Sequence, residues 1–193
     1  MKICVYGAAS PLIDDSYIMS VEKLGEIIAR RGHGLVFGAG ANGLMGAAAR
    51  GVKRGGGHIH GVIPTFFRDE QIEAIYESCD ELEFTESMHE RKRRMEDSAD
   101  AFIITPGGIG TLEEFFEILT LKQLGRHQKP IIIFNINDYY SELLAVMKNA
   151  VNKGFINAKC TELYGCAEDA EQAVRLAEEM GGCGYSVSEL KNG

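Results

Sequence analysis

The chain has 193 residues, of which 45% are hydrophobic and 25% charged, which is the composition of an ordinary globular domain with a full core. Its formal net charge of −8 disfavours nucleic acid or an anionic membrane surface as a partner. The five cysteines are scattered and form no C-x-x-C pair, so neither a disulfide framework nor a zinc site is indicated. No stretch approaches the ~20 apolar residues of a membrane span. We expect a cytoplasmic protein.

Short apolar segments alternate with longer helical patterns, which is typical of a parallel sheet covered by helices on both faces. Strands are expected at 3–6, 35–37, 58–63, 82–84, 101–105, 131–135 and 163–164. Helices are expected at about 16–31, 44–54, 88–98, 112–124, 139–153 and 169–180. The pattern predicts one α/β domain over residues 1–180 with a mostly parallel sheet of about seven strands. A loose tail is expected at 181–193.

The second expected strand is followed by a G-x-G-x-x-G pattern at residues 38–43. This pattern is found in dinucleotide sites, but here it does not open the fold. The next strand also ends without the carboxylate that would bind a ribose diol. Gly40 and Gly43 remain candidates for a close approach of the backbone to a ligand. The alternative is a tight turn whose small residues pack on the sheet.

A second glycine-rich loop, Pro-Gly-Gly-Ile-Gly-Thr-Leu-Glu-Glu at 106–114, lies between a strand and a helix. Backbone amides and the start of a helix together favour phosphate binding. The absence of G-K-[ST] excludes a nucleoside-triphosphate P-loop. Thr111 and Glu114 also match a capping box with Thr111 as the N-cap. A carboxylate in that position is expected to stay ionised, suited to orienting water and not to donating a proton.

A third motif, residues 87–95, combines a capping-box match with a basic run. Ser87 and Glu90 predict the start of a helix. The run 91–94 then lies in the first turns, where cations oppose the helix dipole. Arg91 and Lys92 are candidates for contacts with phosphate or ribose, whereas the two later arginines are expected on a solvated face.

No metal or cofactor is expected. His58 and His60 share one strand face, but no third ligand lies near them in the sequence. No Ser/His/Asp or Cys/His arrangement is recognisable either.

Together the motifs resemble the Lonely Guy (LOG) family of cytokinin riboside 5′-monophosphate phosphoribohydrolases, which older usage called possible lysine decarboxylases. The resemblance covers most of the chain through ordered matches at 38–46, 61–64 (G-V-I-P), 88–92 (M-H-x-R-K), 106–114 (P-G-G-x-G-T-x-x-E) and 123–130. It implies a Rossmann-like three-layer sandwich that forms a homodimer or a higher homo-oligomer. It also implies hydrolysis of the N-glycosidic bond of a nucleoside 5′-monophosphate, such as AMP or an N6-substituted AMP, to free base and ribose 5-phosphate.

The resemblance places the catalytic pair at Arg91 and Glu114. It places nucleotide contacts at Lys92, Gly107, Gly108, Ile109, Gly110, Thr111, Leu112, Glu113, Thr120 and, by spacing alone, Glu73. The chain departs from the family pattern in the loop 6–10, at Ala39 and at Ile109. No residue is recognisable as the acid that protonates the departing base.

Three alternatives stay open at this point. The chain could be a non-catalytic carrier of a nucleotide or of molybdenum cofactor, since such carriers have a similar glycine pattern. It could be an AMP nucleosidase with no cytokinin role. An NAD oxidoreductase is disfavoured by the missing ribose carboxylate, and lysine decarboxylation has no motif in its support.

Overall fold

A computed structural model describes residues 1–192 and contains one seven-stranded sheet in which all strands run parallel. The strands are β1 Lys2–Tyr6, β2 Gly34–Phe37, β3 Ile59–Pro64, β4 Glu81–Thr85, β5 Ala101–Ile104, β6 Ile131–Phe134 and β7 Gly165–Ala167. Their order across the sheet is β4-β3-β2-β1-β5-β6-β7. Because the chain moves outward from β1 in one direction and then from β5 in the other, the loops after these two strands meet at a switch point.

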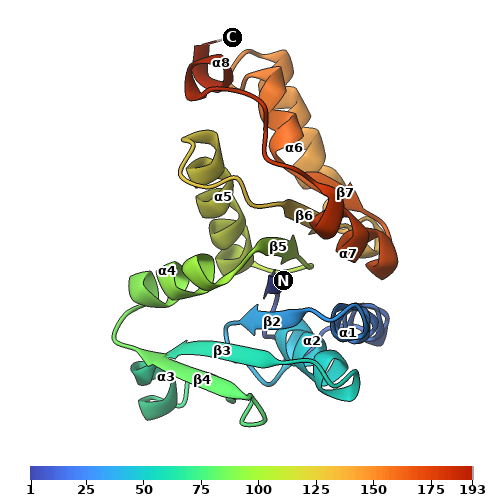
Figure 1. Cartoon of the computed structure of the whole chain (residues 1–193), viewed down its shortest axis with the longest axis vertical. Helices are drawn as coiled ribbons and strands as arrows, with labels where there is room; N and C mark the ends of the chain where they lie inside the picture. Colours follow the sequence, from blue (N-terminus) through green and yellow to red (C-terminus); the bar gives the residue numbers. More distant parts are fainter. Residues whose placement is uncertain (193) are drawn as a thin grey trace.

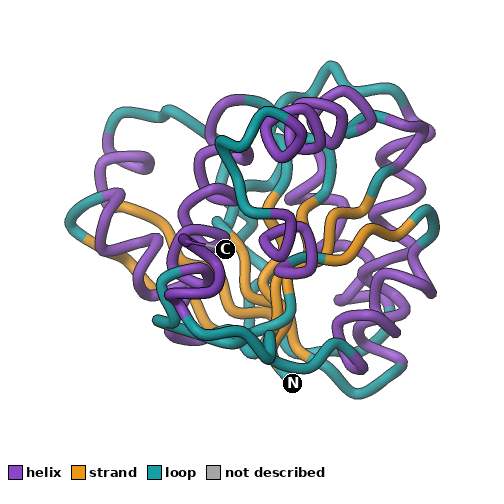
Figure 2. Tube along the Cα trace, turned by 90° about the horizontal axis from the view of Figure 1, so that it is seen from above, coloured by secondary structure: helices purple, strands orange, loops and turns teal. Residues whose placement is uncertain are grey.

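Helices cover both faces of this sheet, as Figures 1 and 2 show. The helices are α1 Asp15–Arg30, α2 Gly43–Arg54, α3 Thr65–Asp69, α4 Met88–Ser98, α5 Ile109–Gln123, α6 Ser141–Asn152, α7 Ala170–Glu179 and α8 Val187–Asn192, with 3-10 turns η1 Ile136–Asp138 and η2 Ala158–Leu163. Residues of α1, α2 and α7 pack on one face, and residues of α4, α5, α6 and α8 pack on the other. The predicted three-layer α/β fold is therefore confirmed.

Alternation along the strands explains the two cores. In β1, Ile3 and Val5 face α1 and α2, whereas Cys4 and Tyr6 face α4 and α5. Side chains on successive strand residues point to opposite faces, so a strand buried on both sides reads as a continuous apolar run. Among residues 1–192, no helix combines the length and the apolarity needed to cross a membrane.

The structure differs from the prediction at the C-terminal end. The seventh strand is formed by Gly165–Ala167 and not by 163–164, because Asn157 caps a 3-10 turn that extends through Leu163. Residues 181–193 were expected to be a loose tail, but 187–192 form α8, and Leu190 is 2% exposed. The burial of Leu190 in the core beside η2 explains why this part of the expected tail is ordered. Gly193 lies outside the described residues.

Two glycines allow α1 and α2 to pack unusually closely. A Cβ on Gly25 would overlap the carbonyl oxygen of Ala48, and a Cβ on Gly51 would overlap that of Glu22. On the outer side of this contact, Glu22 accepts hydrogen bonds from Arg50 at 2.8 Å and from Arg54 at 2.6 Å.

We expect Gly51→Ala to destabilise the fold by about 1–3 kcal/mol, because the added methyl group would force the two helices apart. Helix propensity alone predicts the opposite sign, a stabilisation of about 0.5–1 kcal/mol. Urea denaturation measures the difference. Gly181→Ala, where no atom lies within 4 Å of the added Cβ, is the control. A stabilised Gly51→Ala protein would contradict the close packing.

Candidate functional site

A cleft of about 410 Å³ opens at the switch point, at the carboxyl ends of the central strands. It brings together predicted site residues from three parts of the chain: Glu73, Arg91, Gly108, Gly110, Thr111, Glu113 and Glu114. A smaller apolar cleft of about 180 Å³, which includes Tyr17 and Tyr139, adjoins it. Ala8 and Gly108 line both clefts.

The start of α5 forms one wall of the larger cleft. The helix begins at Ile109 with Gly108 as its N-cap, and no side chain caps it. The predicted capping box is therefore wrong at this position. The first amides of a helix have no partner within the helix, so without a cap they are free to bind an anion. Space is open beside Gly108 and Gly110, whereas the side chain of Thr111 fills the space beside Gly107.

The carbonyl groups of the same loop are held by protein donors. The hydroxyl of Tyr140 donates to the Thr105 carbonyl at 2.7 Å, and that of Tyr139 donates to the Gly107 carbonyl at 2.7 Å. The Ala8 amide donates to the Pro106 carbonyl at 3.1 Å. With its acceptors occupied, the loop has only amide donors left to offer a ligand.

The two tyrosines are not among the predicted site residues. They follow β6 after Asn137 and Asp138, whose φ angles of 50° and 58° are left-handed. Asn and Asp tolerate this conformation better than other residues that carry a Cβ. An Asn-Asp-Tyr-Tyr segment two residues after a buried strand is the sequence signal that could have pointed to them.

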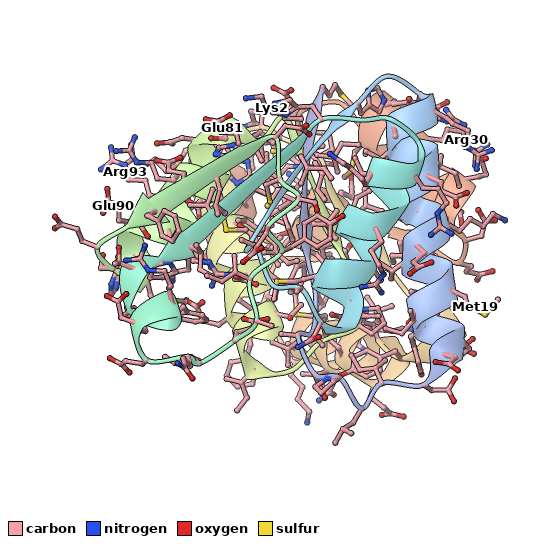
Figure 3. The ribbon with its side chains drawn as sticks, turned by 90° about the horizontal axis from the view of Figure 1, so that it is seen from below. Lys2, Met19, Arg30, Glu81, Glu90 and Arg93 are labelled. Carbon is pink, nitrogen blue, oxygen red and sulfur yellow. The ribbon has the colours of Figure 1, made fainter. Side chains whose placement is uncertain are left out.

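Arg91 lies at the floor of the cleft and is 6% exposed. Its Nε donates to the Val62 carbonyl at 3.2 Å and its Nη2 to the Gly38 carbonyl at 3.3 Å. The guanidinium carbon also lies 5.7 Å from the centre of the Phe67 ring. The predicted helix start is confirmed, since Ser87 accepts a hydrogen bond from the Glu90 amide at 3.2 Å. Arg93 points away from the fold, as predicted (Figure 3).

Glu114 lies in the second turn of α5 and lines the cleft while partly buried. Burial raises the pKa of this carboxyl to about 7, and the charge of Arg91 opposes the rise. This corrects the expectation of a permanently ionised carboxylate at a helix cap. A pKa near 7 lets the group both accept and donate a proton at neutral pH.

Glu73 reaches the cleft from the loop between α3 and β4. Its Oε1 is buried and has no hydrogen-bond partner among the described residues. Burial raises the pKa of this carboxyl, and Arg91 again opposes the rise. An unpartnered buried acceptor in a cleft is available to a donor from a ligand.

Lys92 was predicted to contact a nucleotide, but it does not line the cleft. Its Nζ lies 2.6 Å from Glu113 Oε1 and 2.7 Å from Glu117 Oε2, so it joins α4 to α5. The lysine is 9% exposed, and its ion pairs raise its pKa despite its burial. In this structure Lys92 fixes the helices that carry Arg91 and Glu114.

The other predicted residues lie outside the larger cleft. Ile109 is 89% exposed at the start of α5, and Thr120 is exposed further along the same helix. Leu112 packs against the core. The sides of Gly40 and Gly43 that lack a Cβ are covered by Glu73 and by the backbone of residues 8–10, respectively.

Metal-ligating side chains do not gather anywhere in residues 1–192: no group of three His, Cys, Asp or Glu is arranged to hold an ion. His60 is 3% exposed and lies 3.3 Å from Glu83, away from the cleft.

An open parallel sheet with a ligand cleft at its switch point defines a Rossmann-like α/β protein. The profile of the family described as "Possible lysine decarboxylase" matches residues 45–177. The probable cytokinin riboside 5′-monophosphate phosphoribohydrolase LOGL5 of Oryza sativa subsp. japonica is 39% identical over 98% of this chain and 76% of its own length. LOG7 of Arabidopsis thaliana, of the same named activity, is 39% identical over 92% of this chain and 81% of its own. The chain belongs to the Lonely Guy (LOG) family.

Solved structures of lower identity share the fold. The molybdenum cofactor carrier protein of Chlamydomonas reinhardtii is 20% identical with a TM-score of 0.68, covering 93% of this chain and 96% of its own. The molybdenum cofactor binding protein of Rippkaea orientalis is 22% identical with a TM-score of 0.66, covering 92% and 93%. At these identities the likeness concerns the fold alone.

The raised pKa of Glu114 has a consequence for stability. Between pH 4.5 and about 7 the folded protein keeps a proton that the unfolded chain releases, so the free energy of unfolding falls as pH rises through this range. We expect this decrease in the free energy of unfolding to be smaller by on the order of 1–3 kcal/mol in Glu114→Gln, which has no carboxyl to titrate at this position. Urea denaturation between pH 4.5 and 8 measures it, with the exposed Glu77→Gln as control. An unchanged pH dependence would contradict the burial of the carboxyl.

Proposed function

We propose that this protein hydrolyses the N-glycosidic bond of AMP or an N6-substituted AMP, giving the free base and ribose 5-phosphate. The observation that carries the proposal is the cleft, in which a carboxyl of pKa about 7 and a fixed guanidinium lie beside an uncapped helix start. The names of the relatives that are 39% identical support the same reaction.

In this proposal the 5′-phosphate binds at the start of α5. The loop amides from Gly107 to Thr111 supply the donors, because the loop carbonyls are already bonded to Tyr139, Tyr140 and Ala8. The helix dipole adds about half a positive charge. The protein as a whole carries −8, so these local donors must attract the phosphate without help from the net charge. Phosphate binding would then place the sugar between Arg91 and Glu114.

Cleavage breaks the bond between C1′ and the base nitrogen, and the bonding electron pair leaves with the base. Positive charge builds on the ribose ring, and the ionised Glu114 stabilises it. Water adds to C1′ and gives a proton to Glu114, which passes it to the departing base. One carboxyl can perform both transfers when its pKa is close to the working pH. Glu114 thus also fills the role of the acid for which the sequence offers no candidate.

Two neighbouring groups complete the proposed site. Arg91 uses Nε and one Nη2 hydrogen on backbone carbonyls, and its Nη1 reaches the Met88 sulfur at 3.9 Å, so one hydrogen on each Nη is left for a ribose or phosphate oxygen. Glu73 offers its carboxylate as the acceptor for a ribose hydroxyl. Lys92 contributes by holding α4 against α5 and not by touching the substrate.

We expect purified protein to release free base from AMP or isopentenyl-AMP, and Glu114→Gln to lower kcat at least ~10²-fold. For the wild type, kcat/KM should rise as pH passes about 7, since the ionised carboxylate receives the proton from water. Chromatography of the base measures both effects, with circular dichroism to verify folding. The rate ratio for the two nucleotides separates a cytokinin-type enzyme from a plain AMP nucleosidase. Normal turnover by Glu114→Gln would refute the assigned role.

A carrier of molybdenum cofactor is the second candidate, because the solved structures with this fold include proteins of that name. The pairing of Arg91 with a proton-exchanging Glu114 in one cleft favours hydrolysis. Tight nucleotide binding by the wild type without any release of base would favour the carrier.

We also infer that the protein works as a homodimer or higher oligomer through α5. Ile109 and Phe116 are 89% and 39% exposed, and Thr120 follows one turn later on the same face. Thr120 lies roughly 16 Å along the helix from Ile109, out of reach of its own cleft. A second copy packed on this face would cover the apolar side chains and bring its Thr120 towards the cleft.

We expect Phe116→Arg to reduce the mass in solution to that of one chain, because an arginine cannot be buried unpaired in an apolar contact. Light scattering measures the mass. Val146→Arg, a 63% exposed position on α6, is the matched control and should leave the mass unchanged. A Phe116→Arg protein of unchanged mass would exclude this face as the interface.

A further inference from the structure

The Gly-Ala-Gly segment at residues 38–40 resembles a ligand-binding loop in sequence, yet its glycines face protein side chains. A Cβ on Gly38 would overlap Nη2 of Arg91 and lie 2.9 Å from its Cζ. A Cβ on Gly40 would overlap Oε1 of Glu73 and lie 2.7 Å from the Met45 methyl group. The space that glycine leaves at each position is therefore filled by a charged side chain of the cleft.

At Gly38 this space fixes the orientation of the guanidinium. Arg91 reaches the Gly38 carbonyl with Nη2 at 3.3 Å while its Nε reaches the Val62 carbonyl at 3.2 Å. Val62 is on β3 and Gly38 directly follows β2, so the arginine spans the ends of two neighbouring strands. A side chain at position 38 would stand where Nη2 of Arg91 lies, so the guanidinium would have to leave its bond to the Gly38 carbonyl.

At Gly40 the loop also holds the segment that carries Glu73. The Ala41 amide donates to the Ala74 carbonyl at 2.8 Å, and the Tyr76 amide donates to the Ala39 carbonyl at 2.8 Å. Gly40 itself forms an isolated bridge with Ile75. Backbone bonds on both sides of Gly40 thus press the segment 73–76 against the loop, with the carboxyl of Glu73 in the space beside the glycine.

We propose that Gly38 and Gly40 are positioning residues that set the distance and angle between Arg91 and Glu73, so that the two side chains together hold the ribose of a nucleoside 5′-monophosphate. The ligand class rests on the proposed function. In this assignment the loop at residues 38–40 provides room for the two charged side chains, and its amides do not bind phosphate. A guanidinium that donates and a carboxylate that accepts, each fixed on its own glycine, match the ring oxygen and the hydroxyls of a ribose.

A double-mutant cycle tests whether the space beside Gly38 positions Arg91. Gly38→Ala should weaken AMP affinity roughly tenfold in the wild type but less than about twofold when Arg91→Met is also present, because methionine lacks the guanidinium that the new methyl would displace. Calorimetry measures the affinity of each variant for AMP. Urea denaturation of the same four proteins gives the corresponding cycle for the free energy of unfolding. Gly34→Ala, at the start of the strand that Gly38 follows and with its nearest atom at 3.4 Å, is the control. Equal losses in both backgrounds would overturn the proposal.

A cycle of Gly40→Ala with Glu73→Ala tests in the same way whether the space beside Gly40 positions Glu73. In steady-state kinetics, Gly38→Ala should both lower kcat and raise KM, because Arg91 belongs to the proposed catalytic pair, whereas Gly40→Ala should act mainly on KM. A purely structural role would lower active protein without this split. If Gly38→Ala alone does not fold, folding of the double variant with Arg91→Met supports the positioning role of Gly38. Failure of both variants to fold overturns that role.

The outcome can be separated from that of the proposed function. A wild type that releases no base refutes the hydrolase, while the affinity cycle still decides whether the glycines position the two side chains. If AMP does not bind, the cycle measured by urea denaturation decides the same question. Coupled stability losses support the positioning role of the two glycines, and additive losses overturn it.

Discussion

The cleft depends first on the buried guanidinium of Arg91. Its bonds to the ends of β2 and β3 anchor α4 over the sheet, and its charge lies close enough to Glu73 and Glu114 to oppose the effect of burial on both carboxyls. Removing the arginine would leave two partly buried carboxyls and two backbone carbonyls without their shared partner. Such a centre must be assembled as a unit, because each charged group lowers the cost of burying the others.

Lys92 performs the matching task on the other side of α4. Adjacent helix residues point in different directions, so Arg91 faces the cleft while Lys92 faces α5. By bridging Glu113 and Glu117, one turn apart, Lys92 fixes the rotation of α5 about its axis. That rotation decides whether Glu114 faces the cleft. The two neighbouring cations of one motif thus differ in position: Arg91 lines the cleft, and Lys92 joins α4 to α5.

The parallel strands, the layers and the glycine-rich loop before α5 could be predicted from the sequence, because apolar alternation and glycine spacing act locally. The side-chain geometry could not. Thr111 and Glu114 fit a capping box in the letters, but the helix starts three residues earlier, so Glu114 lies partly buried and its pKa is near 7. Lys92 fits a ligand position, but its partners come from a helix 21 residues later. Ion pairs and burial depend on tertiary packing, which no local pattern encodes.

The anchoring tyrosines have a wider consequence. Tyr139 and Tyr140 lie beyond β6, more than thirty residues after the loop whose carbonyl groups they hold. Their direction is set by a left-handed turn at Asn137 and Asp138. The geometry of the glycine-rich loop after β5 is therefore set from the neighbouring strand through two phenol groups. A change in that distant turn would alter selectivity without any contact with the bound molecule, which gives evolution a way to adjust this cleft while its charged centre stays intact.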